Sequence, residues 1–176
     1  IGRMLAAKKR FDEKAETLAE ESKIFQQYQN PQTSTDLNNV VTRAEAAGVT
    51  RIISIGTDIV GSQKTIEIAE RYPSVYAAVG LHPTNVVEEK IDIPSLRELA
   101  AHPKIVALGE SGIDYHHRPE GMSLSVEAAW KEAQAEAFQE QLDLAVELGL
   151  NVIIHQRDSL HASEAWNDTL RILKAY

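Results

Sequence analysis

Two short apolar runs decide the fold of this chain: Ile105-Val-Ala-Leu-Gly-Glu110 and Asn151-Val-Ile-Ile-His155. Each run is bounded by turn or helix signals and is followed by a stretch with helical spacing, a pattern that predicts buried strands of a parallel sheet. Each run also ends on a residue that can hold a metal. Because the carboxyl ends of neighbouring parallel strands lie about 4.8 Å apart at one edge of a sheet, Glu110 and His155 are expected to share one cation.

The composition limits the classes of function. The chain has 176 residues, 43% of them apolar, which is enough for one domain with a hydrophobic core. It is short of the roughly 250 residues of a complete eight-stranded α/β barrel. The formal net charge of -8 argues against nonspecific coating of nucleic acid, because that mode needs a basic surface. The charge is compatible with a nuclease whose bound cations offset the repulsion locally.

The sequence also bears on the cellular compartment. Cysteine is absent, which excludes disulfides, thiolate ligands and a cysteine nucleophile. No apolar run approaches the roughly 20 residues of a membrane span, and no signal-peptide core is visible. These observations predict a cytoplasmic protein without membrane contact.

From Thr35 onward the chain alternates strand and helix patterns, as βα units do. A first helix is expected to follow Thr35 as its N-cap and to stop at Gly48. The segment 111–125 has no clear period and is expected to be a long loop that carries function. The expected strands cover residues 51–56, 75–80, 105–110 and 151–155, and the helices after them cover residues 62–72, 94–102, 125–148 and a last segment with Trp166, Leu170 and Leu173 on its core face. Four parallel strands fit either an open sandwich or half of a barrel.

Residues 1–33 differ from the rest of the chain. The segment is rich in Ala, Lys, Glu and Gln, has no strand pattern, and places Met4, Phe11, Leu18 and Phe25 seven residues apart. The companion heptad positions include Lys14 and Glu21, so a surface helix or a disordered arm is favoured over a partner-binding helix. We therefore divide the chain into an atypical helical segment, residues 1–33, and an α/β barrel domain, residues 34–176.

Four motifs occur in the order found in one known family. They are Gly48-Val-Thr-Arg-Ile-Ile-Ser-Ile-Gly-Thr-Asp58, Val79-Gly-Leu-His-Pro83, Ala107-Leu-Gly-Glu-Ser-Gly-Ile-Asp-Tyr115 and Val152-Ile-Ile-His-Gln-Arg-Asp158. The segment Phe138-Gln-Glu-Gln-Leu-Asp-Leu-Ala145 is similar to the family's helix between the last two motifs. With these motifs the chain resembles the TatD family of metal-dependent hydrolases.

The resemblance implies a fold, a cofactor and a site. The fold would be that of a TIM-type (β/α)₈ barrel, and the activity that of a Mg²⁺-dependent deoxyribonuclease, with Mn²⁺ or Zn²⁺ as alternative metals. Glu110 would be the carboxylate shared by the metals and His155 a histidine ligand, and both would be catalytic. His82 and Arg157 match motif positions near the pocket and would contact the substrate, DNA.

The sequence also departs from the family. Members open with a strand that carries a metal-binding His-x-His pair, and no such pair occurs here. Members also continue beyond the position of Tyr176. The chain is therefore expected to hold only about half of the barrel, its second to fifth strands, together with two of the ligands and the N-terminal helix.

Each candidate residue has a structural alternative. Glu110 could be solvated or paired, and His155 could be a satisfied core histidine. His82 could cap the turn before Pro83. Arg157 could clamp a phosphate bidentately or pair with a neighbouring carboxylate. Asp114 is expected to orient its neighbours rather than to bind metal.

The remaining histidines, His102, His116, His117 and His161, are assigned no catalytic role. Two alternatives to the DNA hydrolase stay open. One is a non-catalytic half-barrel that serves as a structural or interaction module, with self-association through its open sheet edges. The other is a metallohydrolase that acts on another phosphoester or on an amide.

Overall fold

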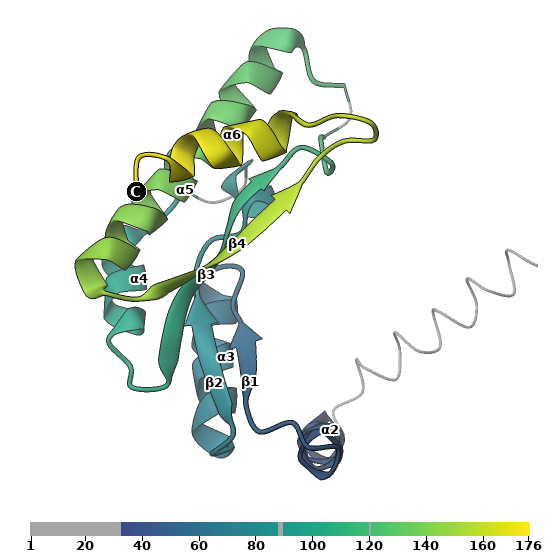
Figure 1. The fold of residues 1–176 in the computed structure, drawn as a ribbon, viewed down its shortest axis with the longest axis vertical. Helices are drawn as coiled ribbons and strands as arrows, with labels where there is room; N and C mark the ends of the chain where they lie inside the picture. The colour runs from purple at the N-terminus through teal and green to yellow at the C-terminus, as the bar shows by residue number, and fades with distance from the viewer. Residues whose placement is uncertain (1–32, 88–89, 120) are drawn as a thin grey trace, which may run out of the picture. The chain divides into compact units, whose positions relative to one another are not determined.

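The computed structural model describes residues 33–87, 90–119 and 121–176. Its sheet has four parallel strands in sequence order: β1 (Ile52–Ile55), β2 (Val75–Val79), β3 (Ile105–Asp114) and β4 (Asn151–Arg157) (Figure 1). Parallel crossovers are nearly always right-handed, so strands added in one direction carry their helices on one face. An open doubly wound sheet would reverse its strand order. The structure therefore confirms the half-barrel and excludes the open sandwich.

The helices follow the predicted alternation. They are α2 (Thr33–Ala46), α3 (Ile59–Arg71), the 3-10 helix η1 (Pro83–Val87), α4 (Ile93–Ala100), α5 (Leu124–Leu148) and α6 (Glu164–Leu173). Asp58 caps α3 by accepting from the Gly61 amide at 2.6 Å, and Gly149, with a φ of 64°, ends α5 in the left-handed conformation. In the described part of the chain, no helix is both long and apolar enough to cross a membrane.

The chain divides into two compact units, Ile1–Thr50 and Arg51–Tyr176. In the first, α2 ends before Gly48, whose φ is 88°, so the predicted stop is confirmed. The predicted start is wrong, because the helix already begins at Thr33 rather than after Thr35. The prediction for residues 1–33 lies almost wholly outside the described residues, and the predicted domain boundary stays a prediction.

Two strands run past their predicted ends. β3 continues for four residues beyond Glu110, and β4 continues for two beyond His155. The expectation of a loop from residue 111 is therefore wrong as far as Asp114. The polar residues Glu110 and His155 do not mark the ends of these strands, because they lie on a face of β3 and β4 that is polar. The register pairs Gly112 with His155 and Asp114 with Arg157.

The main core cluster lies between β3, α5 and α6. It consists of the buried residues Ile113, Tyr115, Trp130, Phe138, Leu142, Ala165 and Ile172. The predicted core face of α6 is wrong for Trp166 and Leu170, which are 51% and 37% exposed, although Leu173 does pack against the core. Helical spacing alone cannot separate two stripes one residue apart, and α6 buries the neighbouring stripe of Ala165, Thr169 and Ile172.

Two edges of the sheet remain open in the described part of the chain. β1 and β4 are its outer strands. On β1, Ile53 and Ile55 are 46% and 39% exposed. Open edges with apolar side chains favour association in general, and self-association of this chain stays a prediction.

Two buried glutamines of α5 hold the backbone beside the strand ends. Gln141 accepts from the Leu81 amide at 2.8 Å and donates to the Leu81 carbonyl at 3.1 Å. Gln134 does the same for Asp114, at 2.7 and 3.0 Å. The two glutamines are seven residues apart, two helical turns, and therefore lie on one face of α5. Together they fix the segment that leads to His82 and the end of β3.

We expect Gln141→Met to destabilise the fold, because it leaves a buried amide and a buried carbonyl of Leu81 without partners. The cost should be about 2 kcal/mol or more in the free energy of unfolding, measured by urea denaturation. Gln139→Met, on the exposed face of the same helix, is the matched control and should change stability by at most about 0.5 kcal/mol. Equal stabilities of the two variants would contradict the role of Gln141.

Candidate functional site

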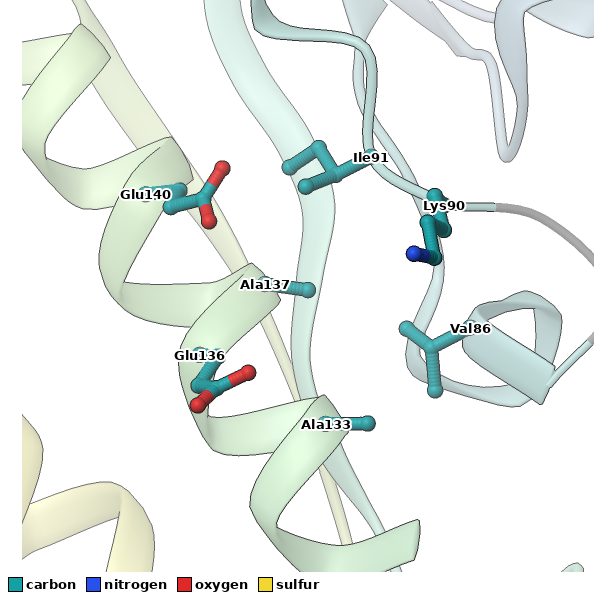
Figure 2. A pocket seen from close by; sticks show the side chains of 7 residues that line it. All are labelled: Val86, Lys90, Ile91, Ala133, Glu136, Ala137 and Glu140. Atoms are coloured by element: carbon teal, nitrogen blue, oxygen red, sulfur yellow. The ribbon is translucent and has the colours of Figure 1, made fainter.

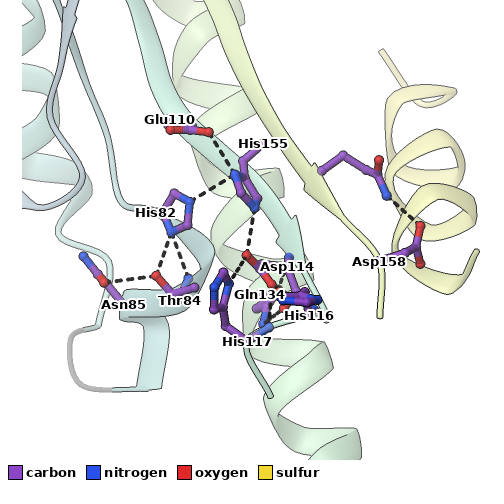
Figure 3. A network of polar contacts seen from close by, with 11 residues as sticks. His82, Thr84, Asn85, Glu110, Asp114, His116, His117, Gln134, His155 and Asp158 are labelled. Carbon is purple, nitrogen blue, oxygen red and sulfur yellow. Dashed lines mark hydrogen bonds and ion pairs between the residues drawn. The ribbon is translucent and has the colours of Figure 1, made fainter. Parts of the chain in front are cut away.

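Three potential metal ligands converge at the carboxyl-terminal part of the sheet (Figure 3). They are His82 after β2, Glu110 on β3 and His155 on β4, and one nitrogen or oxygen of each lies within 4.8 Å of the others. His155 Nδ1 is 2.8 Å from Glu110 Oε1 and 3.1 Å from His82 Nε2. The two residues at the predicted strand ends are thus neighbours, and His82 joins them.

His82, which was predicted to contact the substrate, is itself part of this cluster. Its backbone amide donates to the Thr57 carbonyl at 2.9 Å, and the preceding residue, Leu81, is held by Gln141. Its ring meets that of His155 edge to face, with centroids 4.3 Å apart. This position makes His82 a candidate ligand rather than only a substrate contact.

Asp114 connects the cluster to the buried end of β3. Its side chain is fully buried, and Oδ1 accepts from the amides of His116 and His117 at 2.9 Å each. Oδ2 accepts from His117 Nδ1 at 2.8 Å and from His155 Nε2 at 2.9 Å. The predicted role of Asp114 as a residue that orients its neighbours fits these four hydrogen bonds.

Two groups of the cluster have shifted pKa values. Burial lowers the pKa of His82 below 6.5, the nearby His155 adds to this, and the charges of Glu110 and Asp114 oppose it without reversing it. Burial opposes the ionisation of Asp114, but the hydrogen bonds from the backbone and ring of His117 and from His155 outweigh it, so the pKa of Asp114 lies below its ordinary value. The cluster therefore favours a neutral His82 beside an ionised Asp114.

Arg157 lies at the exposed end of β4, in register with Asp114. Within the described ranges its guanidinium forms no ion pair. The neighbouring carboxylate of Asp158 is engaged elsewhere, because it accepts from the amides of Ala165 and Trp166 at the start of α6, at 2.7 and 3.2 Å. Arg157 is therefore available for an anionic ligand.

The three donors fit a divalent cation. Ligands of Zn²⁺ lie about 2.0 to 2.2 Å from the metal, so two ligands of one ion are at most about 4.4 Å apart. The separations of 2.8 and 3.1 Å around His155 Nδ1 lie within that limit, and all three ligand atoms lie within 4.8 Å of one another, which is close to it. Two imidazoles and one carboxylate suit Zn²⁺ and Mn²⁺ and are also compatible with Mg²⁺.

The sequence did not single out the residues that support this cluster. Thr84 lies beside His82 Nδ1 and bonds in turn to Asn85, and Gln134 and Gln141 hold the backbone. One signal was present for the glutamines: two polar residues seven apart on the stripe of α5 that also carries Phe138 and Leu142. A buried polar residue on an apolar helix face needs a hydrogen-bond partner, and here the partners are the backbone groups beside the site.

A separate pocket lies between α5 and the chain from η1 to α4 (Figure 2). Its volume is about 350 Å³, and Ala133 and Ala137 on α5 face Val86 and Ile91 across it. The other lining residues are Lys90, Glu136 and Glu140. None of the three metal-ligand candidates lines this pocket, so it is distinct from the cluster.

The chain is similar to known proteins over most of its length. The model of the family described as TatD related DNase matches residues 26–176. An uncharacterized metal-dependent hydrolase, YabD of Bacillus subtilis (strain 168), is 38% identical over 144 residues, which cover 81% of this chain and 51% of the relative. The 3'-5' ssDNA/RNA exonuclease TatD of Citrobacter rodentium (strain ICC168) is 34% identical over 140 residues, covering 77% and 50%.

One solved structure is similar as well. The crystal structure of YJJV, a TatD homolog from Escherichia coli K12, aligns with a TM-score of 0.60 and 25% identity, covering 84% of this chain and 62% of that chain. The chain spans about half the length of the curated relatives it matches.

The shifted pKa of His82 can be measured by NMR. In metal-free protein the His82 ring should take up its proton with a midpoint below pH 6.5, because burial disfavours the imidazolium, so the neutral, ligating form predominates at pH 6.5. Glu110→Gln removes a charge that favours protonation and should lower the midpoint further. A wild-type midpoint above 6.5 would show that the carboxylates outweigh burial.

Proposed function

Because the chain belongs to the TatD family of metal-dependent hydrolases, we propose that it acts in the metal-dependent hydrolysis of phosphodiester bonds in DNA. The observation that carries the proposal is the convergence of His82, Glu110 and His155 within 4.8 Å. The Citrobacter relative is a 3'-5' ssDNA/RNA exonuclease, which supports a single-stranded substrate attacked from its 3′ end, with RNA as the second candidate substrate.

The residues would divide the chemistry between them. A divalent cation bound here supplies a water of lowered pKa and stabilises charge on the phosphate oxygens. Glu110, His82 and His155 would hold the cation. Glu110 is half-buried, so one carboxylate oxygen can face the cation while water still reaches the site. Arg157 would bind a phosphate oxygen pair through its planar guanidinium.

Two arguments bear on the identity of the metal, and they favour different ions. The family resemblance favours Mg²⁺. The two imidazole nitrogens favour Mn²⁺ or Zn²⁺, because Mg²⁺ prefers oxygen ligands. We propose that the site binds Mn²⁺ more tightly than Mg²⁺ and that the abundance of Mg²⁺ decides which metal is used.

The proposed activity predicts metal-dependent cleavage of a 5′-labelled single-stranded DNA oligomer by the whole chain, followed on denaturing gels with Mn²⁺ or Mg²⁺. Glu110→Gln and His155→Ala should lower the rate by on the order of 100-fold or more, because the first removes the negative charge of one ligand and the second removes a ligand. The exposed Glu132→Gln is the matched control and should keep full activity. Cleavage that is equal in wild type and in both ligand variants would refute the proposal.

The same assay separates the alternatives. Metal binding without cleavage of DNA or RNA would favour the non-catalytic module. Hydrolysis confined to a small phosphomonoester or an amide in a substrate panel would favour a metallohydrolase that acts on another substrate.

Arg157→Ala should weaken the binding of single-stranded DNA on the order of 10-fold, because the variant loses a charge-assisted contact to phosphate. The slope of log affinity against log salt should fall by about 0.7. Fluorescence anisotropy in EDTA measures both quantities without cleavage. Arg71→Ala, at the exposed end of α3, controls for the loss of one positive charge. If the two variants bind alike, Arg157 is no phosphate contact.

A further inference from the structure

A half-exposed histidine lies beside the candidate metal site and has no part in the proposed chemistry. His117 follows the end of β3 by three residues, and 52% of its side chain is exposed. Its Nδ1 lies 2.8 Å from Asp114 Oδ2, the same oxygen that lies 2.9 Å from His155 Nε2. The ring of His117 is thus joined through one oxygen atom to the ring of a candidate metal ligand (Figure 3).

The His117 ring is held in place although it is exposed. The backbone amide of His117 donates to Asp114 Oδ1 at 2.9 Å, and its ring is bonded to the other oxygen of the same carboxylate. Asp114 is fully buried, and Gln134 is bonded to both its backbone amide and its carbonyl. A side chain that is already ordered loses little conformational entropy when a ligand binds to it.

At least one face of the ring is left uncovered by the neighbouring aromatic group. The ring of His116 lies with its centroid 4.9 Å away and its plane at 86° to that of His117. Two perpendicular rings do not stack on each other, because the edge of one meets the face of the other. His117 therefore keeps a flat aromatic surface that a second planar group can cover.

The surroundings of the ring indicate the chemistry of that planar group. The Tyr115 amide donates to the Arg157 carbonyl at 2.9 Å, so the chain leaves β3 beside the end of β4. His117 and the candidate phosphate contact Arg157 thus follow neighbouring strands, at the edge of the sheet where the candidate metal ligands gather. A nucleotide combines an anionic group with a planar base, and unpaired bases stack on the rings of Phe, Tyr, Trp and His.

We propose that the ring of His117 is a stacking platform for an unpaired base of a single-stranded nucleic acid whose phosphate lies at the candidate metal site. The inference rests on the proposed function for the presence of nucleic acid, and it adds a strand preference, because a base in a duplex must first be unpaired and unstacked. Stacking uses the face of the ring and so does not depend on which ring nitrogen carries hydrogen. It tolerates any base, because every base has a π-face.

His117→Phe and His117→Ala separate stacking from hydrogen bonding. Both variants lose the ring nitrogens and the bond to Asp114, but only phenylalanine keeps an aromatic face. The affinity for a labelled single-stranded DNA oligomer of mixed sequence is measured by fluorescence anisotropy in EDTA, without cleavage. We expect affinity to fall about 5- to 100-fold in His117→Ala and to stay within about 3-fold of wild type in His117→Phe. His102→Ala is the control, because His102 precedes β3, at the other end of the sheet, and bonds to Glu70.

Further measurements identify the base as the partner of the ring. An oligomer with abasic sites at its 3′ end should bind wild type as weakly as the intact oligomer binds His117→Ala, and the variant should lose nothing more. The slope of log affinity against log salt should be the same in His117→Ala as in wild type, because no phosphate contact is lost. The preference for a single strand over a duplex should be smaller in His117→Ala than in wild type.

Equal binding by wild type and His117→Ala would overturn the inference. Equally weakened binding by the Phe and Ala variants would also overturn it, because the ring nitrogens would then make the contact. If the variants do not fold, as judged by circular dichroism, the wild type decides, since equal affinity for intact and abasic oligomers contradicts the platform. The expected binding pattern without metal-dependent cleavage would refute the proposed activity and still support the platform. A wild type that binds neither single-stranded DNA nor RNA would overturn the platform itself.

Discussion

The side-chain amides of Gln134 and Gln141 set the position of the potential metal ligands. Each glutamine holds the backbone of one residue at the site: Gln134 holds Asp114, and Gln141 holds Leu81, which precedes His82. An amide group offers one donor and one acceptor and so matches the amide and carbonyl of a single residue. Seven residues of helix at a rise of 1.5 Å separate the two by about 10 Å. Because each glutamine is bonded to one of them, Leu81 and Asp114 are held at positions set by that spacing. Helix α5 thus relates the segment that follows β2 to the end of β3.

The register of β3 against β4 explains why the imidazole of His155 contacts two carboxylates. His155 lies opposite Gly112, and Glu110 and Asp114 are the residues two positions before and after that glycine. His155 Nδ1 lies 2.8 Å from Glu110 and His155 Nε2 lies 2.9 Å from Asp114, so both carboxylates flank the His155 ring. A Cβ at Gly112, whose φ is 147°, would collide with the carbonyl oxygen of His155. The absence of a side chain there brings the strands close enough for the ring to bond to both neighbours.

How much of this was predictable depends on the range of the interaction. Local signals predicted the four strands, the helices after them, and the helix stop at Gly48, because capping and period act over a few residues. Apolar runs also located Glu110 and His155 on neighbouring strands. The same signals misplaced the ends of β3 and β4 and the buried face of α6, since strand pairing and neighbouring elements decide these. The contact of His82 with His155 spans 73 residues, and no local pattern encodes its distance.

The acidic composition of the chain and a phosphate substrate are compatible because the charge of the site differs from the charge of the whole. The chain has a formal net charge of -8, yet among the three candidate ligands only Glu110 is anionic. The Asp114 carboxylate is fully buried and hydrogen-bonded to two amides and two imidazoles. A divalent cation held by one carboxylate and two imidazoles would keep a net positive charge, and the Arg157 guanidinium would add to it. Local charge of this kind acts on a phosphate at contact distance, whereas surface charges more than about 8 to 10 Å away are screened by salt.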